Sequence, residues 1–366
     1  MGKTRATLKE VARRAGVHTS TASRALDAGS QHLITEKVIE KVRRAAAHLD
    51  YRRNHAASSL RTKRTRSIGI VIPDITNMLF PPIIRGIEDR LAAQGYVAMI
   101  GHTDGVLGRE RAVIDAFQAR GIDGLIIASA HLNEGAITRA VKQGTSIVTV
   151  NRRVKDGGVS SVTSDDADGI AAVVEHLVGL GHRKIAYISG PEQLSTSHAR
   201  LAAFKKWSKK AGLIGSDAQV ITAAAFQEAE GERCAAALLD SRGKFTAIAC
   251  ANDLLAIGAI SALDKRGLSC PLHTTVTGFN DIPFVDRISP SLTTVRVQQY
   301  QMGWTSAGLL MDNIAKSQKQ RKAVHVVLPV TLIVRASSGP PLRPTERPEQ
   351  EDTGRPNDSI SSSEAL

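Results

Sequence analysis

Apolar runs alternate with amphipathic stretches along most of the chain. The runs that predict buried strands are SIGIVIP (67–73), YVAMIG (96–101), DGLIIAS (123–129), SIVTVN (146–151), KIAYISG (184–190), QVITA (219–223), FTAIACAND (245–253) and TVTGFND (275–281). Helical patterns such as PIIRGIEDRLAAQG, RERAVIDAFQARG and DGIAAVVEHLVGLGH lie between them. Continuous apolar strands that alternate with helices are typical of parallel sheets covered by helices on both faces. Because the pattern occurs in two successive sets, we predict an α/β domain of two similar, Rossmann-like lobes with a cleft between them.

The end of this domain completes the two lobes. LTTVRV (292–297) is expected to cross back from the second lobe to the first. A helix over 300–315 then completes the first lobe. We predict a domain over 67–337, with one lobe at about 67–165 and 297–324 and the other at about 166–296 and 325–337. Residues 338–366 are rich in Pro, Ser and acidic side chains and have no leucine heptad. Such a composition predicts a disordered tail without a coiled coil.

The positive charge of the chain is concentrated at its start. Residues 1–66 contain 16 Lys and Arg against 5 Asp and Glu, which gives +11 of the chain's net charge of +13. A basic segment on a nearly neutral body is typical of a module that binds a polyanion. A solvated basic tail is the alternative, but the segment also has the periodicity of helices, which such a tail lacks.

Three short helices are predicted within the first fifty residues. Thr7 and Glu10 form a capping box, and the apolar positions Leu8, Val11, Ala12 and Ala15 then share one helical face. Gly16 ends this helix, a second runs from about Thr19 to Leu26, and a third follows Thr35. This spacing predicts an all-α helix-turn-helix domain over 1–52, joined to the body by a linker over 53–66.

Several classes of protein are excluded by what the sequence lacks. Cys234, Cys250 and Cys270 are far apart and have no CxxC spacing, which argues against a zinc site or a disulfide framework. Motifs of phosphate-binding loops, serine hydrolases and zinc proteases are absent, so we expect no enzyme, no cofactor and no metal. No apolar run is long enough for a membrane span, and no hydrophobic leader follows the N-terminus, so we expect a cytoplasmic protein that binds no membrane.

Three motifs in order carry a resemblance to a known family. TLKEVARRAGVHTSTASRAL, LDYRRNHAASSLR and SIGIVIPDITN, followed by the two-lobed body, closely resemble the LacI/GalR family of bacterial transcription regulators over residues 6 to about 336. The resemblance implies a periplasmic-binding-protein-like body and a nucleoid-associated homodimer. It further implies that the homodimer, most simply a repressor, binds palindromic double-stranded operator DNA under the control of a small-molecule effector.

The second helix carries hydroxyl side chains and one arginine where soluble helices usually show Glu and Lys. Acidic side chains would repel phosphates, whereas short hydroxyls allow a helix to sit deep in the major groove and contact base edges. The resemblance assigns DNA contacts in the helical domain to Thr7, Leu8, Thr19, Ser20, Thr21, Ser23 and Arg24. Ordinary helix capping is the alternative for Thr19 and Ser20, and a solvated side chain is the alternative for Arg24. His18 replaces a serine that is usual in the family, so we expect a weakened N-cap.

The linker contains a second set of DNA contacts implied by the resemblance. Leu60 matches a residue that wedges into a minor-groove base step, although an isolated leucine usually has no such meaning. Asn54, Ala57 and Ser58 match positions packed against the minor groove or the DNA backbone, and Arg53 stands where the family commonly has proline. We expect this segment, a hinge helix and linker over 53–66, to form its helix only when two copies pack on DNA.

Residues that follow the strands are the candidates for effector binding. Ligands of open α/β sheets bind at the carboxyl ends of the strands. The candidates are Asn77, Phe80, Asn151, Thr196, Arg200, Phe226, Asn252, Asp253 and Asn280. Phe80 and Phe226 have a core role as their alternative, and Asp253 has a helix cap as its alternative. Arg200 is the strongest candidate, because a cation near a helix start is unfavourable beside the macrodipole.

The charge of the effector follows from two departures from the family pattern. Asn151 and Asn280 stand where family members that bind neutral sugars often carry carboxylates. Arg200, with Arg152, is then less neutralised, which favours an anionic effector such as a sugar acid or a phosphorylated metabolite. A neutral sugar remains the other hypothesis.

A ligand-binding protein of the periplasmic transport type is the alternative function, because the body alone fits it. The basic N-terminal domain and the missing signal peptide argue against that function.

Overall fold

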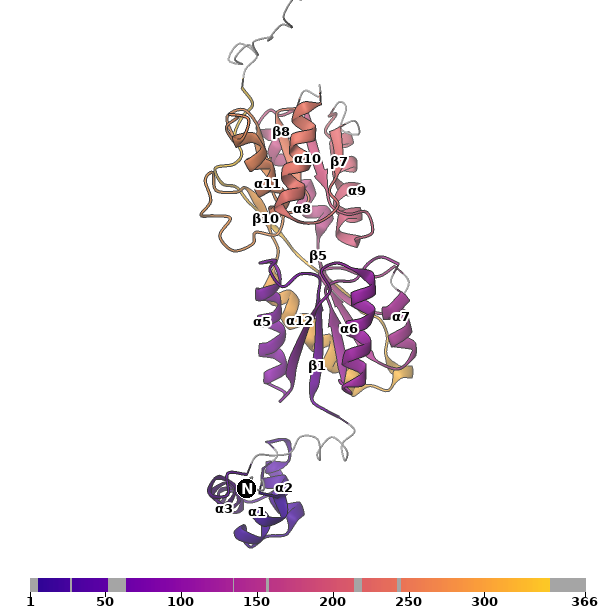
Figure 1. Ribbon diagram of the computed structural model, residues 1–366, viewed down its shortest axis with the longest axis vertical. Helices are drawn as coiled ribbons and strands as arrows, with labels where there is room; N and C mark the ends of the chain where they lie inside the picture. The colour runs from indigo at the N-terminus through magenta and orange to yellow at the C-terminus, as the bar shows by residue number, and fades with distance from the viewer. Residues whose placement is uncertain are drawn as a thin grey trace, which may run out of the picture. The chain divides into compact units, whose positions relative to one another are not determined.

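The computed structural model describes residues 6–342 except 27, 52–63, 134, 156–157, 214–218 and 242–244. These residues form two compact units, which divide between Arg66 and Ser67 (Figure 1). The predicted linker contacts Asn54, Ala57, Ser58 and Leu60 and the predicted tail beyond 342 lie outside the described residues.

The first unit is the predicted helix-turn-helix domain. Its elements are α1 (Leu8–Ala15), α2 (Thr19–Ala25), the 3₁₀ helix η1 (Ala28–Leu33) and α3 (Glu36–His48). The capping box of Thr7 and Glu10 is present, and Gly16 ends α1 in the left-handed region, at φ 59°. Val11 of α1, Ala22 of α2 and Val42 of α3 are fully buried against one another in a small apolar core.

The first lobe of the second unit is built on a six-stranded parallel sheet in the order β11-β5-β4-β3-β1-β2. The strands are β1 (Ser67–Ile72), β2 (Val97–His102), β3 (Gly124–Ile127), β4 (Ser146–Val150), β5 (Ser160–Ser164) and β11 (His325–Leu328). The helices are α5 (Phe80–Ala92), α6 (Leu107–Ala119), α7 (Gly135–Lys142) and α12 (Gln299–Ala315), followed by a 3₁₀ turn, η3 (Gln318–Gln320). Alternate residues of β1 face opposite layers: Ile70 packs in the core with α5 and α12, and Val71 packs with α6 and α7 (Figure 1).

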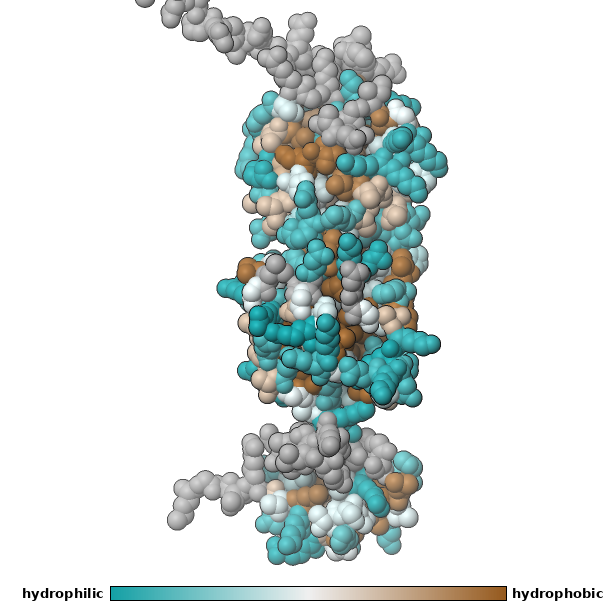
Figure 2. Space-filling view, turned by 90° about the vertical axis from the view of Figure 1, so that its right-hand side faces the viewer, coloured by the Kyte–Doolittle hydropathy of each residue, from teal (hydrophilic) through white to brown (hydrophobic). Residues whose placement is uncertain are grey.

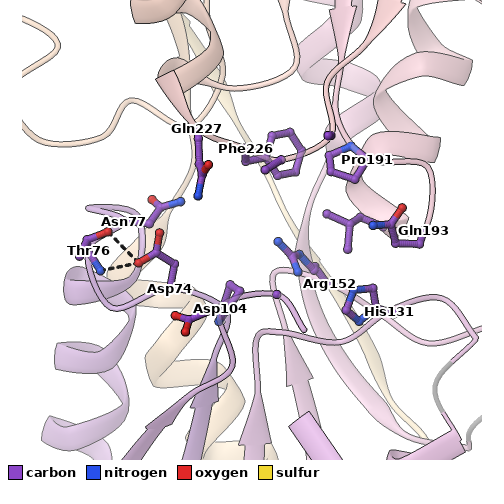
Figure 3. A pocket seen from close by; sticks show the side chains of 15 residues that line it. Asp74, Thr76, Asn77, Asp104, His131, Arg152, Pro191, Gln193, Phe226 and Gln227 are labelled. Atoms are coloured by element: carbon purple, nitrogen blue, oxygen red, sulfur yellow. Dashed lines mark hydrogen bonds between the residues drawn. The ribbon is translucent and has the colours of Figure 1, made fainter. Parts of the chain in front are cut away.

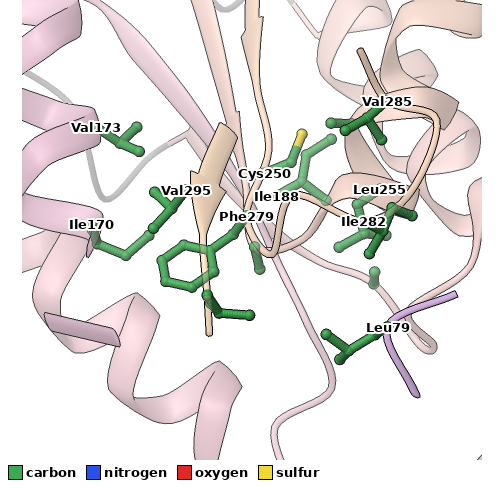
Figure 4. Close-up of a cluster of buried hydrophobic side chains, with 14 of the residues drawn as sticks. Leu79, Ile170, Val173, Ile188, Cys250, Leu255, Phe279, Ile282, Val285 and Val295 are labelled. Carbon is green, nitrogen blue, oxygen red and sulfur yellow. The ribbon is translucent and has the colours of Figure 1, made fainter. Parts of the chain in front are cut away.

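The second lobe contains a four-stranded parallel sheet in the order β7-β6-β8-β9. Its elements are β6 (Ile185–Ser189), β7 (Val220–Thr222), β8 (Ala247–Cys250), β9 (Thr275–Thr277), α8 (Asp166–Gly179), α9 (Ser195–Lys210), α10 (Glu228–Asp240) and α11 (Asp253–Asp264). A separate two-stranded antiparallel sheet consists of β10 (Thr294–Arg296) and β12 (Thr331–Ile333). One cluster of buried apolar side chains runs through both lobes and brings Leu79 of the first lobe together with Ile282 and Phe279 of the second (Figure 4). The predicted α/β class with two parallel sheets is confirmed.

Three strands were not predicted, and one of them corrects the division of the lobes. β11 pairs with β5 in the sheet of the first lobe, although the sequence pattern places 325–337 in the second lobe. The reasons are physical: β5 has the sequence SSVTS and no continuous apolar run, whereas β11 (HVVL) is a short, half-exposed edge strand whose apolar residues do not indicate which sheet it joins. β12 is also a short strand, and its residues are likewise exposed or half-buried.

The predicted tail begins later than expected. Ser337 is fully buried, and its hydroxyl donates to the carbonyl oxygen of Val276 at 2.6 Å. Gly339 follows in the same packing, because its N–H donates to Thr275 Oγ1 at 3.0 Å and its carbonyl accepts from His182 Nε2 at 2.9 Å. Residues 338–342 are therefore held on the second lobe, contrary to the prediction of disorder from 338 onward.

Helices α5 and α12 cross unusually closely, because glycines lie at the contact. A Cβ atom on Gly303 would collide with the carbonyl oxygen of Ile83, and one on Gly86 would collide with the carbonyl oxygen of Tyr300. Both obstacles are backbone atoms, which cannot swing away as a side chain can.

We predict that Gly303→Ala lowers the free energy of unfolding by about 1–3 kcal/mol, because the added methyl group forces the two helices apart. Gly308→Ala on the same helix is the control. Its Cβ would lie 3.7 Å from the Arg90 side chain, an ordinary contact, so the substitution is neutral or stabilising by up to about 1 kcal/mol. Urea denaturation of both variants measures the difference, and equal stabilities would contradict the tight crossing.

Candidate functional site

The N-terminus of α2 is capped by a histidine side chain. His18 Nδ1 accepts a hydrogen bond from the backbone N–H of Ser20 at 3.3 Å, and the same nitrogen lies 2.8 Å from Ser20 Oγ. The sequence predicted a weakened cap because histidine replaces a hydroxyl residue, but the ring nitrogen supplies the missing acceptor. The helix thus has a side-chain cap, and the lower strength expected of that cap stays a prediction.

This geometry fixes the direction of the Ser20 hydroxyl. A backbone N–H can only donate, so His18 Nδ1 must be an acceptor and the ring proton must be on Nε2. The hydroxyl of Ser20 then also donates to Nδ1, which leaves the oxygen lone pairs for partners outside the unit. Ser20 is exposed, so its oxygen is presented to the surroundings as a hydrogen-bond acceptor.

The other predicted DNA contacts of this unit lie at or near its surface. Thr7 and Arg24 are exposed, whereas Leu8, Thr19, Thr21 and Ser23 are half-buried. No acidic residue occurs in the sequence of α2, TSTASRA, and Arg13 and Arg14 lie in the last turn of α1. Within its own sequence, α2 thus presents hydroxyls and a cation but no carboxylate.

A cavity of about 430 Å³ lies between the two lobes. The first lobe lines it with the segments that follow its strands, and the second lobe adds the loops after β6 and β7 (Figure 3). The lining residues are Pro73, Asp74, Thr76, Asn77, Asp104, Gly105, His131, Arg152, Pro191, Gln193, Leu194, Ala224, Ala225, Phe226 and Gln227. Hydrophilic side chains gather on both sides of the junction between the lobes (Figure 2). The carboxyl ends of the strands in both sheets therefore meet at one cavity, as expected for open α/β sheets.

Two of the nine predicted effector residues line this cavity, Asn77 and Phe226. Phe80, Asn151, Thr196, Arg200, Asn252, Asp253 and Asn280 are buried and are not part of its lining. Phe80 is packed in the apolar core, the alternative that its sequence position left open. Sequence reasoning missed Asp104, His131 and Gln227, although each follows a strand of its lobe, and that position was the available signal.

Arg200 is enclosed by protein groups. Its Nε donates to Asp166 Oδ1 at 2.8 Å, its Nη1 donates to the carbonyl oxygen of Ala251 at 2.6 Å, and its guanidinium lies 3.7 Å from the centre of the Phe279 ring. Asn280 Oδ1 accepts a longer bond of 3.4 Å. The expectation that Arg200 is less neutralised because Asn151 and Asn280 replace carboxylates is therefore wrong: Asp166 supplies a carboxylate from another helix. Burial raises the pKa of Asp166, and Arg200 opposes this shift.

Asn252 and Asp253 divide two roles at the start of α11. Asn252 caps the helix, since its Oδ1 accepts from the N–H of Leu255 at 2.9 Å. Asp253 is fully buried and accepts from the N–H of Ile282 at 2.9 Å and from the hydroxyl of Thr294. Burial raises the pKa of Asp253 to about 6 despite these two bonds, which favour the charged form.

Within the described residues, no three His, Cys, Asp or Glu side chains come together as a metal site. No helix in the described part of the chain is long and apolar enough to span a bilayer.

We predict that Arg200→Met lowers the free energy of unfolding by about 3–5 kcal/mol, because it leaves the buried carboxylate of Asp166 without its partner. Adding Asp166→Asn to this variant recovers part of the loss, since the unpaired charge is then removed. Urea denaturation checks both effects, and an unchanged stability of Arg200→Met would contradict the pairing.

We predict a pH-dependent contribution from Asp253. Its pKa in the folded protein is raised to about 6, so between roughly pH 4 and pH 6 the folded state binds a proton that the unfolded chain releases. Its contribution to the free energy of unfolding therefore falls as the pH rises through this window, by about 3 kcal/mol in total. The stability of the wild type minus that of Asp253→Asn should shrink by this amount, and a constant difference across the window would contradict the prediction.

Comparison with known proteins assigns both units. A model of the lacI family of bacterial regulatory proteins matches residues 7–54, and a model of the periplasmic binding protein-like domain matches residues 174–338. The ribose operon repressor of Bacillus subtilis (strain 168) is 31% identical over 334 residues, which are 91% of this chain and 98% of the repressor. The HTH-type transcriptional regulator RegA of Clostridium saccharobutylicum is 31% identical over 332 residues, which are 90% and 98% of the two chains.

Solved structures agree with these relatives. The lac repressor dimer bound to operator and the anti-inducer ONPF superposes with a TM-score of 0.78 at 25% identity, and the match covers 92% of this chain and all of that one. A LacI family transcriptional regulator from Enterococcus faecium with bound ribose gives a TM-score of 0.66 at 32% identity, over 76% of this chain and all of that one. The helix-turn-helix unit, the two-lobed body and the relatives that span both thus lead to one conclusion: the chain belongs to the lacI family of bacterial regulatory proteins.

Proposed function

We propose that the protein is a transcriptional repressor that binds a palindromic operator as a homodimer and changes its DNA affinity when a small molecule occupies the cavity between the lobes. The observation that carries this proposal is the cavity itself, lined by both lobes of a chain whose other unit is a DNA-binding domain. The lac repressor that this chain resembles was crystallised as a dimer on its operator. A two-fold symmetric dimer reads two half-sites, hence the palindrome.

The exposed surface of α2 is the part of the chain that we propose reads the operator. Thr19, Ser20, Ser23 and Arg24 contact base edges and phosphates, with Thr21 beside them and Thr7 and Leu8 at the start of α1. Arg24 suits a guanine, which presents two acceptors in the major groove. Asn54, Ala57, Ser58 and Leu60 stay proposals for the minor groove, with Leu60 as the wedge.

The effector is proposed to bind between Asn77 of the first lobe and Phe226 of the second. An aromatic ring and an amide on opposite walls suit a sugar, a sugar acid or a related metabolite. The structures that this chain resembles include complexes with ribose and with cellobiose. A ligand held by both lobes stabilises one arrangement of the lobes over another, and the effect on DNA binding is reciprocal: the operator changes the affinity for the effector by the same factor.

A transport-type binding protein without a role on DNA is the second function that the body alone would fit. The match of residues 7–54 to the lacI family favours the regulator. The named relatives are repressors and regulators, which supports a function without catalysis.

We predict that Ser20 selects a base that carries an amino group. Its oxygen is presented as an acceptor, and adenine N6 and cytosine N4 are the donors of the major groove. Selection of bound duplexes from a random library should yield a palindrome, and Ser20→Ala should relax the preference at one base pair of each half-site, at a cost of about 0.5–1.5 kcal/mol.

Thr331→Ala removes an exposed hydroxyl from the other unit and is the matched control, with an unchanged selection expected. A wild-type preference for guanine or thymine at the position that Ser20→Ala relaxes would contradict the proposed hydroxyl direction. No preference for any duplex over a scrambled one would overturn the function.

A further inference from the structure

The cavity between the lobes has two acidic groups that are already engaged. Asp74 Oδ1 accepts from the N–H of Thr76 at 2.8 Å and from its hydroxyl at 2.7 Å. Asp104 forms an ion pair with Arg109, and its Oδ1 lies 3.8 Å from His102 Nδ1. Both carboxylates are near Asn77 on one side of the view in Figure 3, whereas Arg152 and His131 are on the other.

Arg152 is the cation of this cavity that lacks adequate partners. The residue is only 7% exposed, and its Nη1 makes one long hydrogen bond of 3.3 Å to the carbonyl oxygen of Ser129. Its Nε has no hydrogen-bond partner among the described residues. Burial lowers the pKa of Arg152 to about 10, so the side chain is still charged at neutral pH. A buried guanidinium with unused donors is costly unless an acceptor arrives.

Among the described residues, the carboxylate of Glu110 acts on Arg152, but one of its two oxygens is already hydrogen-bonded to another residue. Glu110 is fully buried, its Oε1 accepts from the hydroxyl of Ser129 at 2.8 Å, and its Oε2 lies 3.6 Å from Nδ1 of the buried His131. Glu110 and Arg152 have opposite charges and offset each other without a direct hydrogen bond in the structure. Arg200, the other cation that influences Arg152, is neutralised by Asp166.

We propose that the corner formed by Arg152 and His131 binds an anionic group of the effector, a carboxylate or a phosphate, and that His131 takes up a proton when this group binds. This inference rests on the proposed function of the cavity. An anion brings an unbalanced negative charge to a corner in which Glu110 and Arg152 already offset each other. A proton on His131 restores the balance, because the ring then carries a positive charge and its Nδ1, 3.6 Å from Glu110 Oε2, faces that carboxylate as a donor. Asp74 lies at a distance from this corner, and its carboxylate can accept hydrogen bonds from hydroxyl groups of the same molecule. The ligand class is therefore a sugar acid or a sugar phosphate.

The first test is calorimetry and thermal melting of the full-length protein with matched ligands. The probes are ribose, ribose 5-phosphate and ribonate, then glucose, glucose 6-phosphate and gluconate, with inorganic phosphate and acetate as fragments. An acid or a phosphate should bind at least about tenfold more tightly than its neutral parent. Tighter binding of the sugar acids indicates a carboxylate ligand, and tighter binding of the sugar phosphates indicates a phosphate ligand. A neutral sugar that binds as tightly as its anions, or no stabilisation by any anion including the fragments, would overturn the inference.

The second test uses variants of the corner. Arg152→Met should weaken binding of the anion by about thirtyfold or more, and Arg152→Lys should recover part of it. Arg153→Met, which removes the exposed arginine next in the chain, is the control that should bind normally. Circular dichroism melting shows whether each variant is folded, and normal anion binding by folded Arg152→Met would contradict the site.

The third test measures protons, which a purely structural role would not affect. Calorimetry in buffers of different ionisation enthalpy should show uptake of up to one proton on anion binding by the wild type, and none by His131→Gln. Glu110→Gln removes the negative charge in advance, so it should bind the anion without proton uptake. Equal proton uptake in all three proteins would contradict the role of His131.

The same proteins on operator DNA separate this inference from the proposed function. If a neutral sugar binds and changes the DNA affinity, the function stands and the anion site does not. If an anion binds through Arg152 and leaves the DNA affinity unchanged, the site stands and the effector role does not.

Discussion

The direction of the strands is the constraint on which the rest of the body depends. Parallel strands need helical crossovers, and all their carboxyl ends come out at one edge of the sheet. In this chain both parallel sheets turn that edge toward the same cavity, so residues distant in sequence, such as Asp74, Arg152 and Phe226, meet there. The polar groups of the cavity are thus placed by the topology, while the helices on both faces keep the sheets apolar.

Two arginines show how burial and partners separate a structural cation from one available to a ligand. Arg200 joins the first turn of α8, the end of β8 and the segment after β9 through Asp166, Ala251 and Asn280. Its donors are occupied by protein, so it stabilises the second lobe. Arg152 is buried almost as deeply but keeps unused donors beside the cavity. The same side chain therefore has opposite significance at the two positions, and only the identity of the neighbours decides between them.

Much of this could be predicted from the sequence, and the failures have a common cause. Periodicity and capping signals defined the three N-terminal helices and the apolar strands, because these depend on neighbours in sequence. The Ser-rich strand β5 has no apolar run that would indicate it, and the apolar pattern does not show that β11 pairs with β5 in the first lobe. The partner of Arg200 was missed because Asp166 is 34 positions away and its contact arises only when α8 and α9 pack. Likewise, Asn77 and Phe226 were found as lining residues through their place after strands, but Thr196 and Asn252 follow strands equally well and face the interior.

The segment around Ser337 has a consequence for the tendency of the protein to aggregate. β9 is the last strand of its sheet. At this edge the N–H of Val276 donates to the carbonyl oxygen of Ser337, and Thr277 forms a β-bridge with Thr293. Unpaired strand edges are templates for other chains, and natural proteins cover them. A truncation that ends before Ser337 would uncover such an edge and invite edge-to-edge aggregation, whereas affinity tags or fusions placed after residue 342 leave this cover intact.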